Sequence, residues 1–138
     1  MTFRRMAWLA LIASASAASS VEASALPRYG TFTYSSLCWD KEGGDAGGVR
    51  FALTRSRTGV SLVYEYGNGP LEGARITRLT VLGDRIEAEA STSDGDITLS
   101  AELGPKRARY AGPFAGKPGE ARLIKRIKRF KQKIPACR

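Results

Sequence analysis

The sequence contains no histidine, and this absence removes several kinds of chemistry at once. A Ser-His-Asp triad and a Cys–His nucleophile pair both need an imidazole as their base. Two cysteines without a histidine also cannot complete a tetrahedral zinc site. Hydrolases of these kinds and a structural zinc site are therefore excluded.

Other catalytic signals are weak or missing. The glycine-rich stretch 112–119 lacks the spacing and the Lys-Ser/Thr pair of a phosphate-binding loop. Glu65, Glu87 and Glu89 could in principle serve as paired carboxylates, but they fall on strand faces where an outward carboxylate ordinarily favours solubility. The acidic stretch 40–45 does not match a twelve-residue calcium loop and is interpreted as a solvated turn. We expect a protein that is not an enzyme and has no metal or other cofactor.

Long hydrophobic runs are absent too, and the longest apolar stretch lies at the N-terminus. Two arginines precede an apolar run over residues 6–13, and the small-x-small sequence Ala23-Ser24-Ala25 follows. This pattern predicts a secretory signal peptide over residues 1–25, with an earlier cut near Ala17 or Ala18 as the alternative. The remaining 113 residues, 26–138, form one domain without a transmembrane segment, secreted or periplasmic.

Cysteine is scarce, and the two that occur, Cys38 and Cys137, bracket most of this domain. In an oxidising compartment they predict one disulfide. It would close a loop of about 100 residues, for which chain entropy suggests about 4–5 kcal/mol. The bond would hold the C-terminal segment against the region after the first strand. Trp39, next to Cys38, is expected to pack over the bond; the alternative is a ligand-stacking platform.

The middle of the chain alternates apolar and polar residues with period two, which is typical of half-buried strands. The stretch 74–82 alternates less well, so it predicts a strand with a bulge or a strand covered on both sides. The expected strands cover residues 28–36, 48–54, 59–66, 74–82, 84–91, 96–103 and 107–112.

Short turns connect these strands. Gly83-Asp84 and Asp94-Gly95 supply the positive φ of tight hairpins, whereas 41–48 and 67–73 are predicted as wider loops. Consecutive strands with short links pair antiparallel, as a meander. The predicted fold is therefore all-β, a small antiparallel barrel or sandwich of about 6–8 strands.

The segment 119–138 ends the fold either as a basic helix or as a final strand. Its apolar residues recur at gaps of three and four, which favours one helical stripe with Pro135 as its end. The case for a strand rests on architecture, because a meander commonly pairs its last segment with its first. The pattern favours the helix.

The excess of positive charge lies entirely at the end of the chain. Residues 105–138 contain 12 basic residues and one acid, whereas residues 26–104 contain 8 basic and 11 acidic residues. This asymmetry predicts an anion-binding surface for a membrane, lipopolysaccharide, another polyanion or an acidic protein. The alternative is that the cations are solvated and balance the acids of strands 85–90 and 96–103. The candidate anion-binding residues are Lys125, Arg126, Lys128, Arg129, Lys131 and Lys133.

Aromatic residues are concentrated in the expected strands. They are the natural core of a small domain, but in a small barrel they could also line a mouth and bind an apolar ligand. The ligand-facing candidates are Trp39, Tyr64 and Tyr66. The leading hypothesis is a secreted, non-enzymatic binding or accessory protein with a basic C-terminal surface. A barrel that binds an apolar ligand is the alternative.

Overall fold

A computed structural model describes residues 25–138, so the predicted signal peptide lies outside the described residues except for its last residue. Within this range all regular elements are strands. They are β1 (Gly30–Ser35), β2 (Cys38–Trp39), β3 (Ala46–Ser56), β4 (Gly59–Gly69), β5 (Leu71–Leu82), β6 (Arg85–Thr92), β7 (Gly95–Leu103), β8 (Arg107–Ala111) and β9 (Arg122–Ile127).

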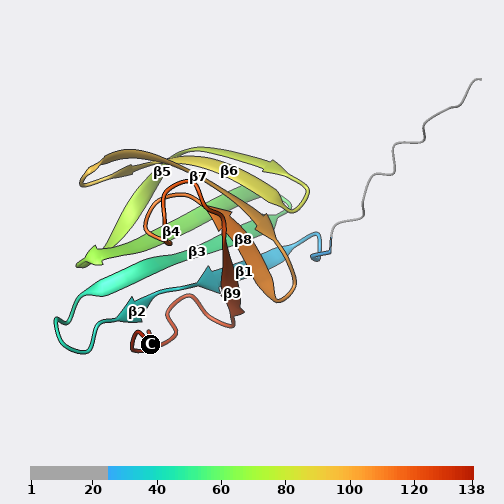
Figure 1. Cartoon of the computed structure of the whole chain (residues 1–138). Coiled ribbons are helices and arrows are strands. Elements are labelled where there is room, and N and C mark those ends of the chain that lie inside the picture. Colours follow the sequence, from blue (N-terminus) through green and yellow to red (C-terminus); the bar gives the residue numbers. More distant parts are fainter. Residues whose placement is uncertain (1–24) are drawn as a thin grey trace, which may run out of the picture.

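The strands form an antiparallel sheet that closes on itself. From β3 to β9 each strand pairs with the next, and β1 then pairs with both β9 and β3. Eight of the described strands thus form a closed barrel, and the short β2 is added beside the start of β3 (Figure 1). The prediction of a small antiparallel barrel is confirmed.

The expected strands are present because their period-two pattern matches the burial. In β3, Val49, Phe51 and Leu53 are buried in the barrel. Ile86 and Leu99 occupy equivalent inward positions in β6 and β7. The bulge predicted in β5 is confirmed, since the register between β5 and β6 shifts between Ile76 and Arg78.

The predicted wide loop 67–73 is instead almost entirely strand, and the predicted loop 41–48 is shortened to residues 41–45. β4 continues to Gly69 and β5 begins at Leu71, so only Pro70 separates them, and β3 already begins at Ala46. Glycine allows the strands to approach closely here. At Gly48, where φ is +92°, an added Cβ would lie 2.4 Å from the carbonyl oxygen of Ser36. The glycines that suggested flexible loops therefore serve close strand packing.

The favoured helix near the C-terminus is wrong, and the final strand is correct. Residues 122–127 form β9, which pairs with β8 and β1 and completes the barrel. As a strand, the segment buries Ile124 but leaves Leu123 65% exposed. The pairing of two open sheet edges outweighs the helical spacing of the apolar residues, because each edge carries unpaired backbone groups.

The largest buried side chains of the barrel interior are aromatic, and the hydroxyl groups of its buried tyrosines are hydrogen-bonded. The hydroxyl groups of Tyr64 and Tyr110 lie 2.6 Å apart, and that of Tyr110 also donates to the carbonyl of Pro113. Tyr34 donates to the carbonyl of Gly104 at 2.7 Å. These bonds satisfy polar atoms that burial would otherwise penalise.

After β9 the chain returns along the outside of the barrel as a segment that we call the strap (residues 128–138). The disulfide between Cys38 and Cys137 holds its end, as predicted. Backbone hydrogen bonds from Trp39 to Pro135 and from Cys137 to Trp39, both 2.8 Å, align the strap with β2. Trp39 is 36% exposed, so it is not a core residue, contrary to expectation.

Removal of the disulfide should destabilise the fold strongly. In the variant Cys38→Ser/Cys137→Ser, we expect the free energy of unfolding to fall by about 3–5 kcal/mol, because the unfolded chain regains the entropy of a loop of about 100 residues. Urea unfolding of the variant and the oxidised protein measures this difference. An unchanged unfolding midpoint would contradict it.

High pH should destabilise the fold through the tyrosine pair. Burial raises the pKa of Tyr64 from 10.0 to about 12, and burial also raises the pKa of Tyr110. The unfolded chain ionises first, so this stability is present below pH 10 and is lost as the pH rises through about 12. Urea unfolding between these pH values should show the loss. In Tyr64→Phe/Tyr110→Phe the loss should be smaller, and an equal loss would exclude this pair as its source.

Candidate anion-binding site

Pairing of β8 with β9 brings together two basic segments of the chain. β8 and β9 pair so that Arg107 lies opposite Lys125, and both side chains are exposed. Arg107 follows Lys106 in the turn after β7, some twenty residues before the basic end of the chain. The site therefore combines residues of β8 and the turn before it with residues of β9 and the segment that follows it, and barrel closure positions them.

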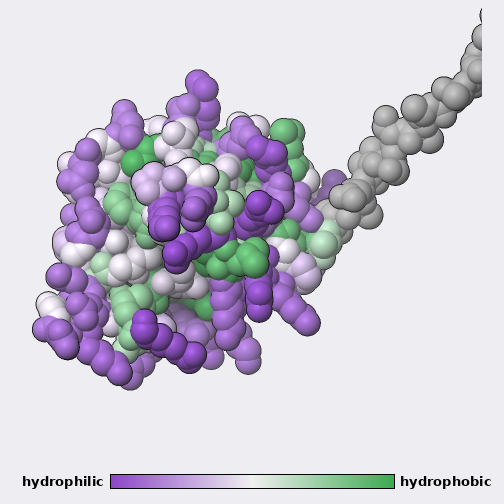
Figure 2. Space-filling view, viewed as in Figure 1, coloured by the Kyte–Doolittle hydropathy of each residue, from purple (hydrophilic) through white to green (hydrophobic). Residues whose placement is uncertain are grey.

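The larger of two adjoining grooves lies on this side of the barrel. Its volume is about 890 Å³. Apolar residues lie beside its cations, and on the face viewed in Figure 2 hydrophobic patches lie among hydrophilic side chains over β8 and β9. We use the term basic face for the basic residues that line this groove, which are Lys106, Arg107, Lys125, Arg126 and Lys128.

The smaller groove, of about 380 Å³, lies between the end of β9 and the strap. Lys125, Arg126 and Lys128 line it as well, and Lys133 adds a cation from the strap. The two grooves therefore share three cations and extend over one continuous surface. Neither groove has an acidic side chain among its lining residues.

A buried ion pair supports the strap where it crosses β3. Arg50 is buried and its Nε donates to Glu65 Oε2 at 3.0 Å, since the two residues are cross-strand neighbours on the outer face. The guanidinium carbon lies 4.6 Å from the centre of the Phe130 ring, and Nη1 donates to the carbonyl of Gln132 at 3.3 Å. Arg50 thus holds the strap, and its charge is already balanced by Glu65.

Arg126 is the cation of the basic face whose side chain is held by a hydrogen bond and by an aromatic ring. Its Nη1 donates to the carbonyl of Pro105 at 3.1 Å, and its guanidinium lies 5.4 Å from the centre of the Phe32 ring. Its backbone N–H also donates to the carbonyl of Lys106. None of these partners carries a negative charge, so the side chain is fixed in place with its charge still available to an anion.

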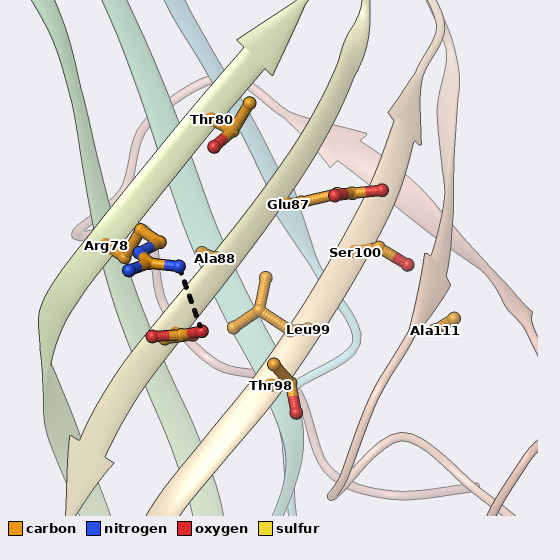
Figure 3. A pocket seen from close by; sticks show the side chains of 9 residues that line it. Arg78, Thr80, Glu87, Ala88, Thr98, Leu99, Ser100 and Ala111 are labelled. Atoms are coloured by element: carbon orange, nitrogen blue, oxygen red, sulfur yellow. Dashed lines mark ion pairs between the residues drawn. The ribbon is translucent and has the colours of Figure 1, made fainter.

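The acids of the neighbouring strands do not neutralise these cations. Glu87 and Glu89 pair with Arg85 and Arg78 at 3.0 and 3.8 Å, and the pair with Arg78 is drawn in Figure 3. That pair borders a separate shallow hollow of about 340 Å³ on the outer side of β5–β8. Across residues 25–138, no salt bridge includes a basic residue of the segment 105–138.

The predicted anion-binding residues are brought together only in part. Lys125, Arg126 and Lys128 line both grooves and Lys133 lines the smaller one, whereas Arg129 and Lys131 are exposed on the strap. Sequence reasoning missed Lys106 and Arg107. The signal for them was the basic run that begins at residue 106, at the start of the predicted strand 107–112. This run indicates a binding site only when that strand is known to pair with the final strand, β9.

The three candidate ligand-facing aromatics lie in different places. Tyr64 and Tyr66 are buried inside the barrel, and the Tyr66 ring stacks on Phe114 with the ring centres 4.3 Å apart. Tyr66 donates a hydrogen bond to Glu72 at 2.7 Å. Trp39 lies outside, beside the disulfide. The three do not form one site.

Comparisons with known proteins leave the site to be judged by its own chemistry. A scan against protein-family models found no match, and searches of the curated proteins and of the solved structures found none either. Among residues 25–138 no helix has the length and apolar character needed to cross a membrane.

The mutual repulsion of these cations should be measurable. Arg107 and Lys125 face each other across β8 and β9, and like charges in that position destabilise a sheet by up to about 1 kcal/mol. We expect Lys125→Gln to raise the urea midpoint slightly at low salt and to have no effect at high salt, where the repulsion is screened. Arg85→Gln, which removes the partner of Glu87, serves as the control and should not raise the midpoint. A lower midpoint for Lys125→Gln at low salt would refute the repulsion.

Proposed function

We propose that this protein is a secreted, non-enzymatic binding or accessory protein whose basic face holds an anionic partner. The partner would carry phosphate, sulfate or carboxylate groups spaced along a chain or headgroup layer. The observation that supports this proposal most is the set of cations in the two adjoining grooves, which have no acidic lining residue and no salt bridge in the described chain.

The cost of this arrangement to the fold is an argument for a role in binding. A protein under selection for stability alone gains nothing from Arg107 opposite Lys125 or from several cations around one groove. Residues that oppose stability while lying together in a concave surface are typical of binding sites. An anion would offset the repulsion and gain charge-assisted hydrogen bonds from Arg107 and Arg126.

The shape of the surface favours an anion that enters the groove. The larger groove is lined by Lys106 and Arg107 at the start of β8 and by Lys125 and Lys128 in and after β9, so a ligand in the groove meets cations from both strands. Leu123 and Ile127 border the same groove and would contact apolar parts of the ligand. An amphiphilic anion fits these neighbours better than a bare ion.

Export supports the same proposal. The predicted signal peptide and the disulfide are both consistent with an oxidising compartment outside the cytoplasm. Phosphorylated and acidic polymers of a cell envelope would be within reach of the basic face there.

The alternative, an apolar ligand bound by interior aromatics, has weaker support. The hydroxyl groups of Tyr64 and Tyr110 bond to each other, and the Tyr66 ring is covered by Phe114. A ligand among these rings would have to break the hydrogen bond between Tyr64 and Tyr110 and displace the ring of Phe114. Uptake of a hydrophobic dye that is insensitive to salt would favour this alternative.

Neutralising the basic face should weaken binding to polyanions. We expect Lys106→Gln/Lys125→Gln/Lys128→Gln to weaken binding to a heparin oligosaccharide about tenfold at low salt and to flatten the dependence of affinity on salt, because fewer counterions are released. Isothermal titration between about 50 and 200 mM salt measures both effects.

A matched control separates the basic face from net charge. Lys41→Gln/Arg75→Gln/Lys117→Gln removes the same charge from exposed positions elsewhere, and it should bind heparin almost as well as the native protein. Equal losses in the two variants would refute the proposal. Flotation with phosphatidylglycerol vesicles, run in parallel, distinguishes a lipid headgroup from a soluble polyanion as the natural source of the charge.

A further inference from the structure

Strands β4 and β5 are neighbours along only part of their length. They pair over Tyr64–Gly67 and Leu71–Ala74, whereas Gly59–Val63 pairs only with β3 and Arg75–Leu82 only with β6. In Figure 1 the two strands meet near one end and diverge toward the other. The bulge at Ile76 and Arg78 marks the point of separation, because a bulge bends its strand away from the regular ladder.

The divergence leaves two strand edges facing a slot in the barrel wall. An antiparallel strand directs alternate pairs of N–H and C=O groups to its two neighbours. Within residues 25–138, Gly59–Val63 and Arg75–Leu82 each lack one of these neighbours. An extended polypeptide between them could pair with backbone groups on both sides, which an apolar small molecule cannot do.

Apolar side chains along the slot are less buried than their positions in the strands predict. Val60 belongs to the inward set of β4 with Leu62 and Tyr64, which are buried, yet Val60 is 48% exposed. On the other side of the slot, the inward residues Leu79 and Val81 of β5 are only partly buried. This exposure is the result expected where a strand is missing, and an added strand would cover it.

The wide end of the slot opens into a basic groove of about 560 Å³. Val60 and Val81 line it from the two strands, and Arg28, Arg55 and Arg57 add positive charge without an acidic lining residue. Arg55 is committed to Asp84, with an Nη2–Oδ1 distance of 3.5 Å. Arg28 and Arg57 form no salt bridge in the described chain and remain free for an anionic group.

We propose that this slot binds an extended segment of a partner protein by strand addition between β4 and β5. The bound segment carries apolar residues at alternate positions, which cover Val60, Leu79 and Val81, and an acidic side chain or a terminal carboxylate near Arg28 and Arg57. A second copy of this chain fits less well, because the chain has a net charge of +9 and would add cations to a basic groove.

This site is distinct from the basic face and does not depend on it. The start of β1 separates the two, since Thr31 lines the larger groove of the basic face and Tyr29 lines the groove of the slot. The partner defined by the slot is a protein, recognised by its backbone and one acidic group. The two sites can therefore be tested separately.

Selection from random displayed peptides of about eight residues, the length of Arg75–Leu82, tests the proposal on the oxidised protein. We expect the selected peptides to alternate apolar residues and to contain an acid near one end. Bound to the labelled protein, a selected peptide should slow amide hydrogen exchange at every second residue of 59–63 and 75–82. This period of two follows from strand addition and not from burial of a surface in general.

Val60→Glu should weaken a selected peptide at least about tenfold, since it places an unpaired carboxylate against an acidic, apolar ligand. Thr98→Glu introduces the same residue at an exposed position of β7 and should change the affinity less than about twofold. Arg28→Gln/Arg57→Gln should weaken an acidic peptide but not its amide counterpart. Heparin binding should be unchanged in Val60→Glu. Peptide binding therefore tests the slot and heparin binding tests the basic face, so the two proposals can fail independently.

Several outcomes would overturn the proposal. They are the absence of any enriched peptide, protection outside the two strand edges, and equal effects of Val60→Glu and Thr98→Glu. A dimer in sedimentation that Val60→Glu dissociates would assign the slot to a second copy instead. Binding of a hydrophobic dye at the slot, without peptide binding, would assign it to an apolar ligand.

Discussion

Barrel closure by β1 is the constraint on which the rest of the structure depends. This strand pairs with β3 on one side and with β9 on the other, so the two ends of the meander meet across it. Its pairing requires the last segment to be extended and to lie beside β8. Closure therefore selects the strand over the helix and also places Lys106 and Arg107 next to the cations of β9.

Closure of the barrel is incomplete between β4 and β5. The basic face and the slot therefore have different physical origins. The basic face arises where two strands pair along their length and carry like charges on the outer side. The slot arises where a bulge in β5 draws it away from β4, so that within residues 25–138 the two strand edges lack a strand between them and Val60 stays half exposed. In one case the protein retains repulsion and in the other it retains exposed apolar surface. Both conditions oppose stability, and a partner of complementary chemistry, as proposed for each site, would remove them.

Sequence patterns predicted those parts of the fold that depend on neighbouring residues in the chain. Strict alternation located most strands, as in Val49, Phe51 and Leu53, and poor alternation located the bulge of β5. The patterns failed where pairing with distant strands decides the conformation of a segment. The spacing of the apolar residues favoured a helix because helical periodicity is local. The partners that make β9 a strand are distant in the chain, since Ile127 pairs with Thr33 and Leu123 pairs with Arg109.

The candidate site shows a similar division between what the sequence predicts and what only the fold reveals. The sequence alone determined the sign and the location of the charge, the absence of imidazole chemistry and the single possible disulfide, because these are properties of composition and of cysteine count. Only the tertiary structure decided which cations share a groove, that their charges remain unneutralised, and that β4 and β5 separate. Those properties depend on strand register and on distances between side chains, which are determined only when the backbone hydrogen bonds of the closed sheet are formed.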